Sequence, residues 1–245
     1  MGVLIKMLYI IGLGLNEQGI SKEGMLALEK CHKVYLDSYT VEFPYELNEL
    51  RLGKKILPLK REDIESNRLI KEAKGRRVVL LVYGSPLFAT THMSLVLDAK
   101  AQNIEVKVIY STSIFDAVAE TGLQLYKFGK IASMPDWKTN KAEFMEYVKE
   151  NQSIKAHSLI LIDIGLSFIK ALNQLEIESK ERKIKIDKIV VCSRLGGDES
   201  KVFYDTISGL REMEEEVKAP FCFIIPSELH FLEKEGLGRF KNPNI

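Results

Sequence analysis

The spacing of apolar residues over positions 1–110 predicts strands that alternate with helices. Short runs rich in Val, Ile and Leu predict strands near Ile56 and at residues 7–11, 33–37, 78–83 and 106–110. Apolar residues three and four positions apart predict the intervening helices, at residues 21–31 with Ser21 as the cap, at 45–52, at 62–74 and from Thr91 onwards. Such alternation is typical of a parallel sheet covered by helices on both faces.

One stretch in this region, residues 78–97, contains no charged side chain. A membrane-spanning helix needs about 20 uninterrupted apolar residues, whereas Gly-Ser-Pro at residues 84–86 interrupts this stretch. We interpret it as a strand buried on both faces, a tight loop, and a helix whose apolar face is formed by Met93, Val96 and Leu97. In parallel sheets, ligands bind at the loops that follow the carboxyl ends of the strands.

Beyond Ser111 the predicted elements lie farther apart, which indicates a second domain. The pattern predicts strands near Ile131 and at residues 158–164, 188–193 and 221–225. It predicts helices at residues 111–125, opened by a capping box of Ser113 and Asp116, and at 140–150, 166–178 and 205–216. We therefore expect an N-terminal α/β domain over residues 1–113 and a C-terminal α/β domain over residues 114–245.

The charge balance and the cysteines exclude some classes of partner. With 35 Lys and Arg against 34 Asp and Glu, the net charge is +1, so no overall field attracts the chain to nucleic acid or to a membrane. The basic residues 179–188 and the acidic residues 212–216 are interpreted as solvated faces. Cys31, Cys192 and Cys222 are too widely spaced for a metal site, and they predict reduced, buried thiols in a cytoplasmic protein.

Glycine-containing turns follow two of the predicted strands. Gly-Leu-Gly-Leu at residues 12–15 allows a ligand to approach the backbone. The dinucleotide-binding fingerprint is incomplete, because Glu17 stands where its third glycine belongs. Asp37, at the end of the second strand, keeps a nicotinamide cofactor as one alternative, and a plain turn is the other. The loop at residues 84–86 is the stronger candidate for binding a ligand.

Other polar positions near these loops have simple structural interpretations. Thr91 is interpreted as a helix cap and His92 as a hydrogen-bonded surface histidine. Ser-Arg-Leu-Gly-Gly at residues 193–197 follows another predicted strand, and its glycines suit a turn. The sequence contains no P-loop, no nucleophile elbow, and no cluster of His and Cys for a metal. This inventory favours a reaction that needs neither a metal nor a protein nucleophile.

Motifs spread over nearly the whole chain resemble those of the diphthine synthases, S-adenosylmethionine-dependent methyltransferases of the tetrapyrrole methylase superfamily. The matching stretches are IGLGL at 11–15, Tyr39-Thr40, ATTH at 89–92, Ser113-Ile114, GLQLYKFGK at 122–130, Trp137, LIDI at 161–164 and LHFLEKE at 229–235. ATTH and LYKFGK together are specific, whereas GLGL alone is a weak signal.

This resemblance implies an α/β, two-domain tetrapyrrole-methylase-like fold. It has a parallel sheet in the N-terminal domain, a mixed sheet in the C-terminal domain, and S-adenosylmethionine in the cleft between them. The resemblance also implies a homodimer. From the charge balance, the cysteines and the lack of a metal motif we further expect a cytoplasmic protein without a metal, and without nucleic acid or membrane as a partner. The substrate implied is a histidine of translation elongation factor 2 that already bears an aminocarboxypropyl group, whose amine is methylated repeatedly.

Two alternatives keep the same fold. One is a small-molecule methyltransferase with a tetrapyrrole-type substrate, against which the LYKFGK stretch argues. The other is a diverged, non-catalytic binding protein.

Carried over position by position, the resemblance implies cofactor contacts from Leu15, Ser85, Phe88, Ser113, Ile114, Ile162, Leu195 and Phe221. The chain departs from the family at some positions. Ser85 replaces the carboxylate of the usual Gly-Asp-Pro, Gly165 stands where a lysine is common, and Phe221 stands where a histidine is often found. The catalytic residues stay unassigned. Asp163, at the end of a predicted strand, is a hypothesis for the acceptor of the amine proton, motivated by its position alone.

Overall fold

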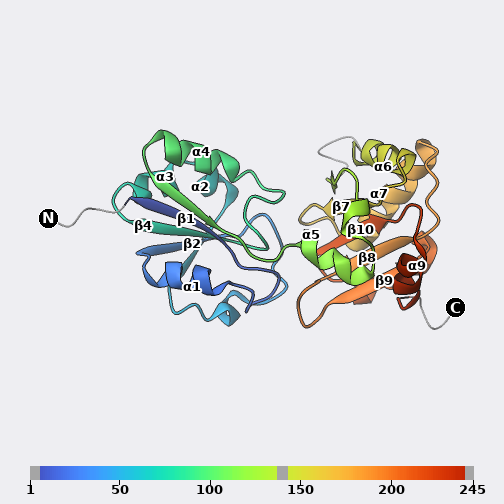
Figure 1. Cartoon of the computed structure of the whole chain (residues 1–245), viewed down its shortest axis with the longest axis horizontal. Helices are drawn as coiled ribbons and strands as arrows, with labels where there is room; N and C mark the ends of the chain where they lie inside the picture. The colour runs from blue at the N-terminus through green and yellow to red at the C-terminus, as the bar shows by residue number, and fades with distance from the viewer. Residues whose placement is uncertain (1–5, 137–142, 241–245) are drawn as a thin grey trace. The chain divides into compact units, whose positions relative to one another are not determined.

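The computed structural model describes residues 6–136 and 143–240 of the chain (Figure 1). Trp137, and the first residues of the helix expected at 140–150, lie outside the described residues. The chain divides into two compact units, Met1–Ile114 and Phe115–Ile245, each with a sheet and a core of its own.

The first unit is built on a parallel sheet, as the alternating pattern predicts. Its strand order is β3-β2-β4-β1-β5. Its strands are β1 (Met7–Gly12), β2 (Lys33–Asp37), β3 (Ile56–Leu59), β4 (Arg77–Val82) and β5 (Glu105–Ile109). Its helices are α1 (Lys22–Glu29), α2 (Arg61–Glu65), α3 (Arg68–Ala73) and α4 (Met93–Ala101), with a 3-10 turn, η1 (Leu47–Leu50). The predicted cap of α1 is confirmed, because the Ser21 hydroxyl accepts a hydrogen bond from Gly24 N at 3.1 Å.

Strand β4 lies in the middle of this sheet and is buried on both faces. Val79 and Leu81 belong to one apolar core, which they share with α1. Leu80 and Val82 belong to the other core, which they share with α3 and α4. Because successive side chains of a strand point to opposite faces, a strand with helices over both faces must be apolar throughout. This double burial accounts for the uncharged start of residues 78–97.

The prediction of a single helix at residues 62–74 is wrong, because the helix is interrupted at Ser66. The backbone of Ser66 is extended, with ψ at 163°. Its hydroxyl donates to Asp63 O at 2.7 Å and accepts from Arg68 N at 3.2 Å. These bonds compete with the helical ladder, so α2 ends and α3 begins anew. The helix predicted at residues 45–52 is also shorter than expected and forms only the 3-10 turn η1.

The apolar face predicted for α4 is wrong as well. The helix buries Leu95, Val96 and Ala99 against the sheet. Met93 and Leu97 are instead 49% and 60% exposed. Apolar residues occur all around this helix, so their spacing fits two different faces equally well.

The second unit contains a mixed sheet with the strand order β6-β7-β10-β8-β9. Strands β6 and β7 are parallel, and the other neighbouring pairs are antiparallel. The strands are β6 (Ala132–Met134), β7 (Ser158–Ile162), β8 (Ile189–Ser193), β9 (Lys201–Asp205) and β10 (Phe221–Ile225). The helices are α5 (Ile114–Ala117), which begins at the last residue of the first unit, α6 (Phe144–Ser153), α7 (Phe168–Glu181), α8 (Ile207–Arg211) and α9 (Phe231–Gly238). The 3-10 turns are η2 (Val118–Thr121), η3 (Leu125–Lys127) and η4 (Glu214–Glu216).

Several elements of this unit differ from the sequence prediction. Strand β9 occupies the sheet edge, where its half-exposed side chains give no clear apolar alternation, and the sequence pattern missed it. The helix expected at residues 205–216 consequently forms only α8 and η4. The helix expected at residues 111–125 ends early, because Gly122 adopts a left-handed conformation with φ at 85°. Helix α9 was also missed.

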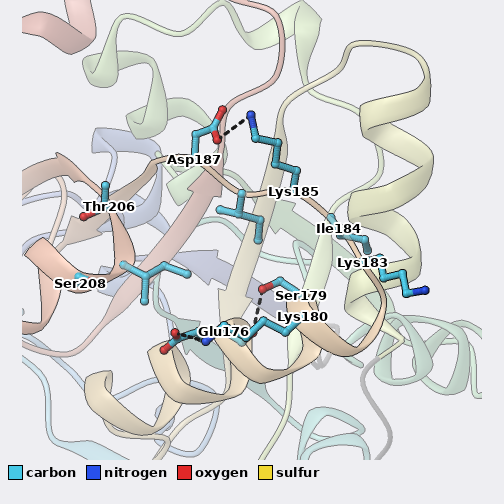
Figure 2. Close-up of a pocket in the computed structure, with 11 residues that line it drawn as sticks. Glu176, Ser179, Lys180, Lys183, Ile184, Lys185, Asp187, Thr206 and Ser208 are labelled. Atoms are coloured by element: carbon cyan, nitrogen blue, oxygen red, sulfur yellow. Dashed lines mark hydrogen bonds and ion pairs between the residues drawn. The ribbon is translucent and has the colours of Figure 1, made fainter.

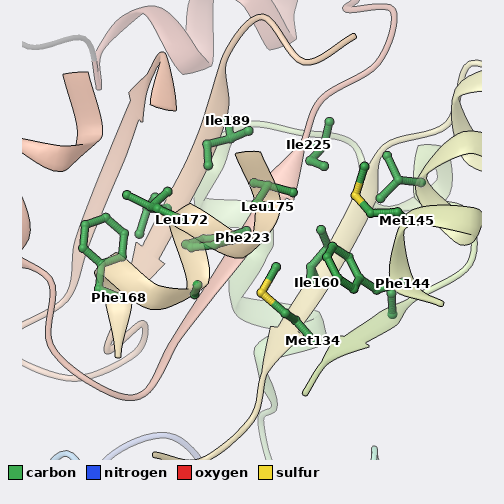
Figure 3. Packing of buried hydrophobic residues seen from close by; sticks show 14 of the residues in the cluster. Met134, Phe144, Met145, Ile160, Phe168, Leu172, Leu175, Ile189, Phe223 and Ile225 are labelled. Atoms are coloured by element: carbon green, nitrogen blue, oxygen red, sulfur yellow. The ribbon is translucent and has the colours of Figure 1, made fainter. Parts of the chain in front are cut away.

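Helices α6 and α7 pack on one face of this sheet (Figure 3). Phe168 and Leu172 from α7, and Phe144 from α6, lie against Ile160 and Phe223 of the strands. The rings of Phe168 and Phe223 meet edge to face, with centroids 6.1 Å apart. Burial of each such side chain stabilises the fold by about 1.5–3 kcal/mol, so this core is the main source of stability within the unit.

A buried carboxylate fastens α9 to the rest of the second unit. The side chains of Glu233 and His157 are both fully buried. Ser227 N donates to His157 Nδ1 at 2.9 Å, which leaves the proton on Nε2 to be donated to Glu233 Oε1 at 3.0 Å. Every polar atom of the imidazole therefore has a partner.

The same carboxylate accepts three further hydrogen bonds. Gln124 N donates to Glu233 Oε1 at 3.0 Å, His230 N donates to Oε2 at 2.8 Å, and the Lys127 ammonium contacts Oε2. Burial by itself would raise the pKa of Glu233, but the bonds from Lys127 and from the two backbone amides lower it to about 2. The GLQLYKFGK and LHFLEKE stretches are thus joined to each other through one side chain.

This network makes the stability of the protein depend on pH. Burial lowers the pKa of His157, against the opposing effect of Glu233. The folded-state pKa values of His157 and Glu233 are both lowered, so at each residue the unfolded chain binds more protons than the folded chain. Stability therefore rises with pH. The His157 contribution is lost as pH falls through its ordinary pKa of 6.5. The Glu233 contribution is lost between 4.5 and about 2, and it corresponds to roughly 3 kcal/mol.

We expect Glu233→Gln to lower the free energy of unfolding at pH 7 by about 3 kcal/mol or more, because it leaves the half-buried Lys127 without its counter-charge. Below pH 4.5 the variant should lose less stability than the wild type, since the titrating carboxyl is gone. Urea unfolding between pH 7 and pH 3 measures both effects. Glu235→Gln, on an exposed neighbour in the same helix, is the control. Parallel curves for wild type and Glu233→Gln would contradict the assignment.

Candidate functional site

Two glycine turns meet at the carboxyl edge of the first sheet. Gly14 N donates to Gly84 O at 3.0 Å, and Gly84 N donates to Gly14 O at 2.9 Å. Both glycines have left-handed backbones, with φ at 73° and 70°, a conformation that costs other residues more. The loop after β1 and the loop after β4 are therefore joined directly, at neighbouring strands in the centre of the sheet.

Gly12 makes this close approach of the loops possible. A Cβ atom at Gly12 would lie 2.6 Å from Gly84 O and 2.8 Å from Pro86 Cδ, well inside van der Waals contact. The glycines of residues 12–15 thus serve the packing of one loop on another. That role explains why they occur here without the rest of a dinucleotide-binding fingerprint.

The meeting point of these loops coincides with the place where the order of the strands reverses. From β1 the chain continues into α1 on one face of the sheet, and from β4 it continues through α4 on the other face. Strands β1 and β4 are neighbours, so their loops diverge to opposite faces. Ligands of doubly wound sheets bind in the crevice that such divergence leaves outside the strand ends.

The structure brings most of the predicted contact residues of the first unit to this edge. The side chains of Leu15, Ser85 and Ser113 are buried, so they present mainly backbone atoms. Ser113 lies beside Gly84, with its Cα 3.9 Å from where a Cβ of Gly84 would be. Phe88 is 46% exposed, and Ile114 is half-buried at the start of α5. Backbone groups, two hydroxyls and one exposed aromatic ring therefore gather here.

The loop after β4 carries backbone strain. Leu87 and Ala89 have left-handed backbones, with φ at 68° and 50°, although neither is glycine. Such conformations cost about 1–3 kcal/mol each and persist only where the surroundings enforce them. Three of the six residues 84–89 are left-handed, so the shape of this loop is imposed by its anchors.

His92 follows this loop and is not the surface histidine that the sequence suggested. Its side chain is fully buried, and its Nε2 atom lies 3.1 Å from Oδ2 of Asp37, which is also fully buried. Asp37 accepts hydrogen bonds from Tyr39 N at 3.1 Å and from the Thr40 hydroxyl at 2.9 Å. Neither ring nitrogen of His92 makes a hydrogen bond within the described part of the chain. Sequence pattern missed this pair, because one buried histidine leaves no periodic signal.

The remaining predicted contact residues lie together at one edge of the second sheet. Ile162 ends β7 and Phe221 begins β10, its antiparallel neighbour. Leu195 follows β8, whose last residue, Ser193, pairs with Phe221. Arg194 holds this turn, since its Nε donates to Ala219 O at 2.8 Å and its backbone N donates to Pro220 O at 2.9 Å.

Asp163 directly follows Ile162 at the same edge. Its backbone N donates to Met134 O at 3.1 Å, which fixes the backbone beyond the strand. Partial burial raises the pKa of its carboxyl group above the ordinary value. A carboxylate with a raised pKa is a better proton acceptor than an ordinary one.

An open depression of about 410 Å³ lies at the opposite edge of the second sheet (Figure 2). It is bordered by the end of α7, the loop before β8 and the start of α8. Two of its lysines are paired with acids: Lys180 lies 2.6 Å from Glu176 and Lys185 lies 3.1 Å from Asp187. Because its lining includes none of the predicted contact residues, this depression is separate from the candidate site.

The described residues offer no metal site and no membrane span. Within 6–136 and 143–240, no three His, Cys, Asp or Glu side chains gather as a metal ion requires. No helix in these ranges has the length and apolar character needed to cross a bilayer. Cys31, Cys192 and Cys222 are buried free thiols, as the sequence predicts.

The sequence and the fold both match those of a known protein family. The family model described as Tetrapyrrole (Corrin/Porphyrin) Methylases matches residues 7–211. The chain belongs to the tetrapyrrole methylase family, and it is a methyltransferase of that class.

Within this family the chain is similar to diphthine synthases over nearly its whole length. It is 38% identical to the diphthine synthase of Methanocaldococcus jannaschii, over 94% of this chain and 97% of the relative. It is 31% identical to the diphthine methyl ester synthase of Schizosaccharomyces pombe, over 96% and 94% of the two chains. A solved diphthine synthase structure matches with a TM-score of 0.88 at 31% identity, covering 97% of this chain and 98% of the other. The resemblance, fold class and enzyme class predicted from the sequence are thereby confirmed.

Proposed function

We propose that this protein is a diphthine synthase, which methylates the amine of the modified histidine of translation elongation factor 2 in diphthamide biosynthesis. The observation that carries the proposal is the similarity to diphthine synthases over nearly the whole chain. The general family model ends at residue 211, whereas the similarity to diphthine synthases spans 94–96% of the chain. The part-buried bond between Lys127 and Glu233 joins two of the stretches that resemble diphthine synthases, GLQLYKFGK and LHFLEKE.

S-adenosylmethionine is the methyl donor in this proposal, and the residues at the two sheet edges fit it. A Cβ added at Gly84 would lie 3.9 Å from Ser113 Cα and Thr112 O, in ordinary van der Waals contact, so backbone of two loops gathers here. Backbone amides and carbonyls suit the polar groups of an adenosyl amino acid, and carbonyl oxygens suit a positive sulfonium. The contact residues are Leu15, Ser85, Phe88, Ser113 and Ile114 of the first unit, and Ile162, Leu195 and Phe221 of the second.

Bound S-adenosylmethionine would supply an electrophilic methyl group, so the tasks of the protein are few. It must align the attacking amine with that methyl group and exclude water, which lowers the barrier by fixing the geometry beforehand. It must also accept the proton that the amine loses, and Asp163 is the candidate for this step.

The first expected outcome concerns the reaction itself. Incubation with S-adenosylmethionine and elongation factor 2 bearing the aminocarboxypropyl histidine should add methyl groups to that residue, as measured by mass spectrometry. The Schizosaccharomyces pombe relative is a methyl ester synthase, so the product should then be treated with mild alkali. This treatment removes a methyl group held as an ester and leaves a methyl group on nitrogen. Methylation of a tetrapyrrole instead would favour the small-molecule alternative, and failure to bind S-adenosylhomocysteine would favour a non-catalytic protein.

The proposal includes a cytoplasmic homodimer. Light scattering on the same preparation should give a mass near twice 27.9 kDa. A monomer would remove the dimer from the proposal without affecting the assay.

The second expected outcome concerns Ser85, where the family usually has a carboxylate. Ser85→Asp should strengthen binding of S-adenosylmethionine over neutral S-adenosylhomocysteine by about threefold to tenfold, because only the former carries a sulfonium charge to attract. Calorimetric titration of both ligands measures the ratio, which cancels any general effect on the fold. Ser85→Asn is the uncharged control of matched shape. An unchanged ratio would mean that the sulfonium does not lie near this side chain.

The third expected outcome concerns Asp163. If its carboxylate accepts the amine proton, Asp163→Asn should lower kcat by about a hundredfold or more. In the wild type the rate should rise with pH through the raised pKa of Asp163, and the variant should lack this part of the profile. Steady-state rates from pH 5 to 9 provide the measurement. An unchanged rate and pH profile would remove Asp163 from the mechanism.

A further inference from the structure

The loop after β4 is anchored at both of its ends. Near its start, Gly84 is bonded to Gly14 of the neighbouring strand β1. At its end, His92 lies against Asp37, the last residue of β2, which is the neighbour of β4 on the other side. The residues between these anchors include Phe88 and the left-handed Leu87.

The second anchor is incomplete in this structure. The Nε2 atom of His92 is 3.1 Å from Oδ2 of Asp37, close enough for a hydrogen bond, but the bond is not aligned and Nδ1 has no partner either. Two residues earlier, the hydroxyl oxygen of Thr90 is buried and likewise has no hydrogen-bond partner within the described residues. Buried polar atoms without partners are rare in folded proteins and are costly to keep. Among the described residues, three of the five buried side-chain atoms without a hydrogen-bond partner belong to Thr90 and His92 of this one segment.

We propose that Asp37 and His92 are positioning residues that hold residues 84–92 in the form that binds S-adenosylmethionine. The inference rests on the proposed function and names residues that act on the cofactor through the loop. When the loop closes on the cofactor, His92 Nε2–H becomes aligned with Asp37 and donates to it. Thr90 gains a partner in the same movement.

The geometry explains why this pair is suited to the task. Asp37 is held in turn by Tyr39 N and by the Thr40 hydroxyl, so its carboxylate is a fixed reference point on β2. The rigid acceptor at the end of β2 and the ring of His92, which caps α4, determine where this helix begins. They thereby determine the strained backbone that precedes the helix, which includes Phe88. Loss of the ring would free the left-handed residues to relax.

Calorimetric titration with S-adenosylhomocysteine tests the inference without the protein substrate. His92→Leu, which has similar bulk but no donor, should weaken binding by tenfold or more. His92→Gln, whose amide can donate to Asp37, should restore binding to within about threefold of the wild type. The double variant His92→Leu with Asp37→Asn should bind no more weakly than the worse single variant, because both remove the same contact. His32→Leu, at the opposite end of β2, is the control and should bind normally.

A second variant guards against a failure of His92→Leu to fold. Thr90→Val removes a buried hydroxyl that has no partner in this structure, so its unfolding temperature should equal or exceed that of the wild type. Its affinity for S-adenosylhomocysteine should nevertheless fall by about threefold or more. A purely structural role for this segment would not separate stability from affinity in this way.

The steady-state kinetics supply a further readout. In His92→Gln and Thr90→Val the defect should appear as a raised KM for S-adenosylmethionine, with kcat at saturation close to the wild-type value. Unchanged affinity in folded His92→Leu and Thr90→Val would overturn the inference while leaving the proposed function intact. A wild-type protein that binds no S-adenosylhomocysteine would instead overturn the proposed function, and the inference with it.

Discussion

The reciprocal pair of backbone hydrogen bonds between Gly14 and Gly84 is the constraint on which the candidate site depends. It requires two left-handed glycines, and it requires a third glycine, Gly12, where the loops pass over each other. Once formed, it places the ends of the two central strands side by side as their loops leave toward opposite faces of the sheet. Three of the proposed contact residues, Leu15, Ser85 and Phe88, lie within four positions of this pair, in the same two loops.

The second unit depends on a charged interaction of a different kind. A buried carboxylate is costly unless all of its oxygen lone pairs find donors, and Glu233 finds them in a histidine, a lysine and two backbone amides. Hydrogen bonds to a single carboxylate are directional, so they fix the position of α9 more narrowly than apolar packing alone. The residues of this network lie in the stretches that resemble diphthine synthases, whereas the glycine turns carry only a general signal.

The sequence was a good guide wherever burial was strong and periodic. Strand β4 was found from its lack of charge, because helices cover both of its faces, and the parallel order of the first sheet followed from alternation. It was a poor guide where the environment was mixed: β9 lies at an edge, and α4 is apolar all around, so neither has a unique pattern. A local competition at Ser66, between side chain and helix, was likewise invisible to periodicity.

In the candidate site, the loops could be predicted and their mutual contacts could not. Glycine turns after buried strands carry a visible signal, and the proposed contact positions come from the resemblance to a family alone. Asp37 and His92 are 55 positions apart, and no pattern in the sequence predicts that they are in contact. Their meeting depends on the order of the strands, which places β2 beside β4.

The long sequence separation between Lys127 and Glu233 also affects the order in which the protein folds during synthesis. The two residues are separated by 106 positions, and a contact of such long range forms only after the intervening chain has been ordered. During synthesis, the first unit has all of its strands and both of its glycine turns by residue 114, so it can fold while the ribosome is still at work. In the second unit, Lys127 and His157 gain their shared carboxylate partner only after α9 has been synthesised.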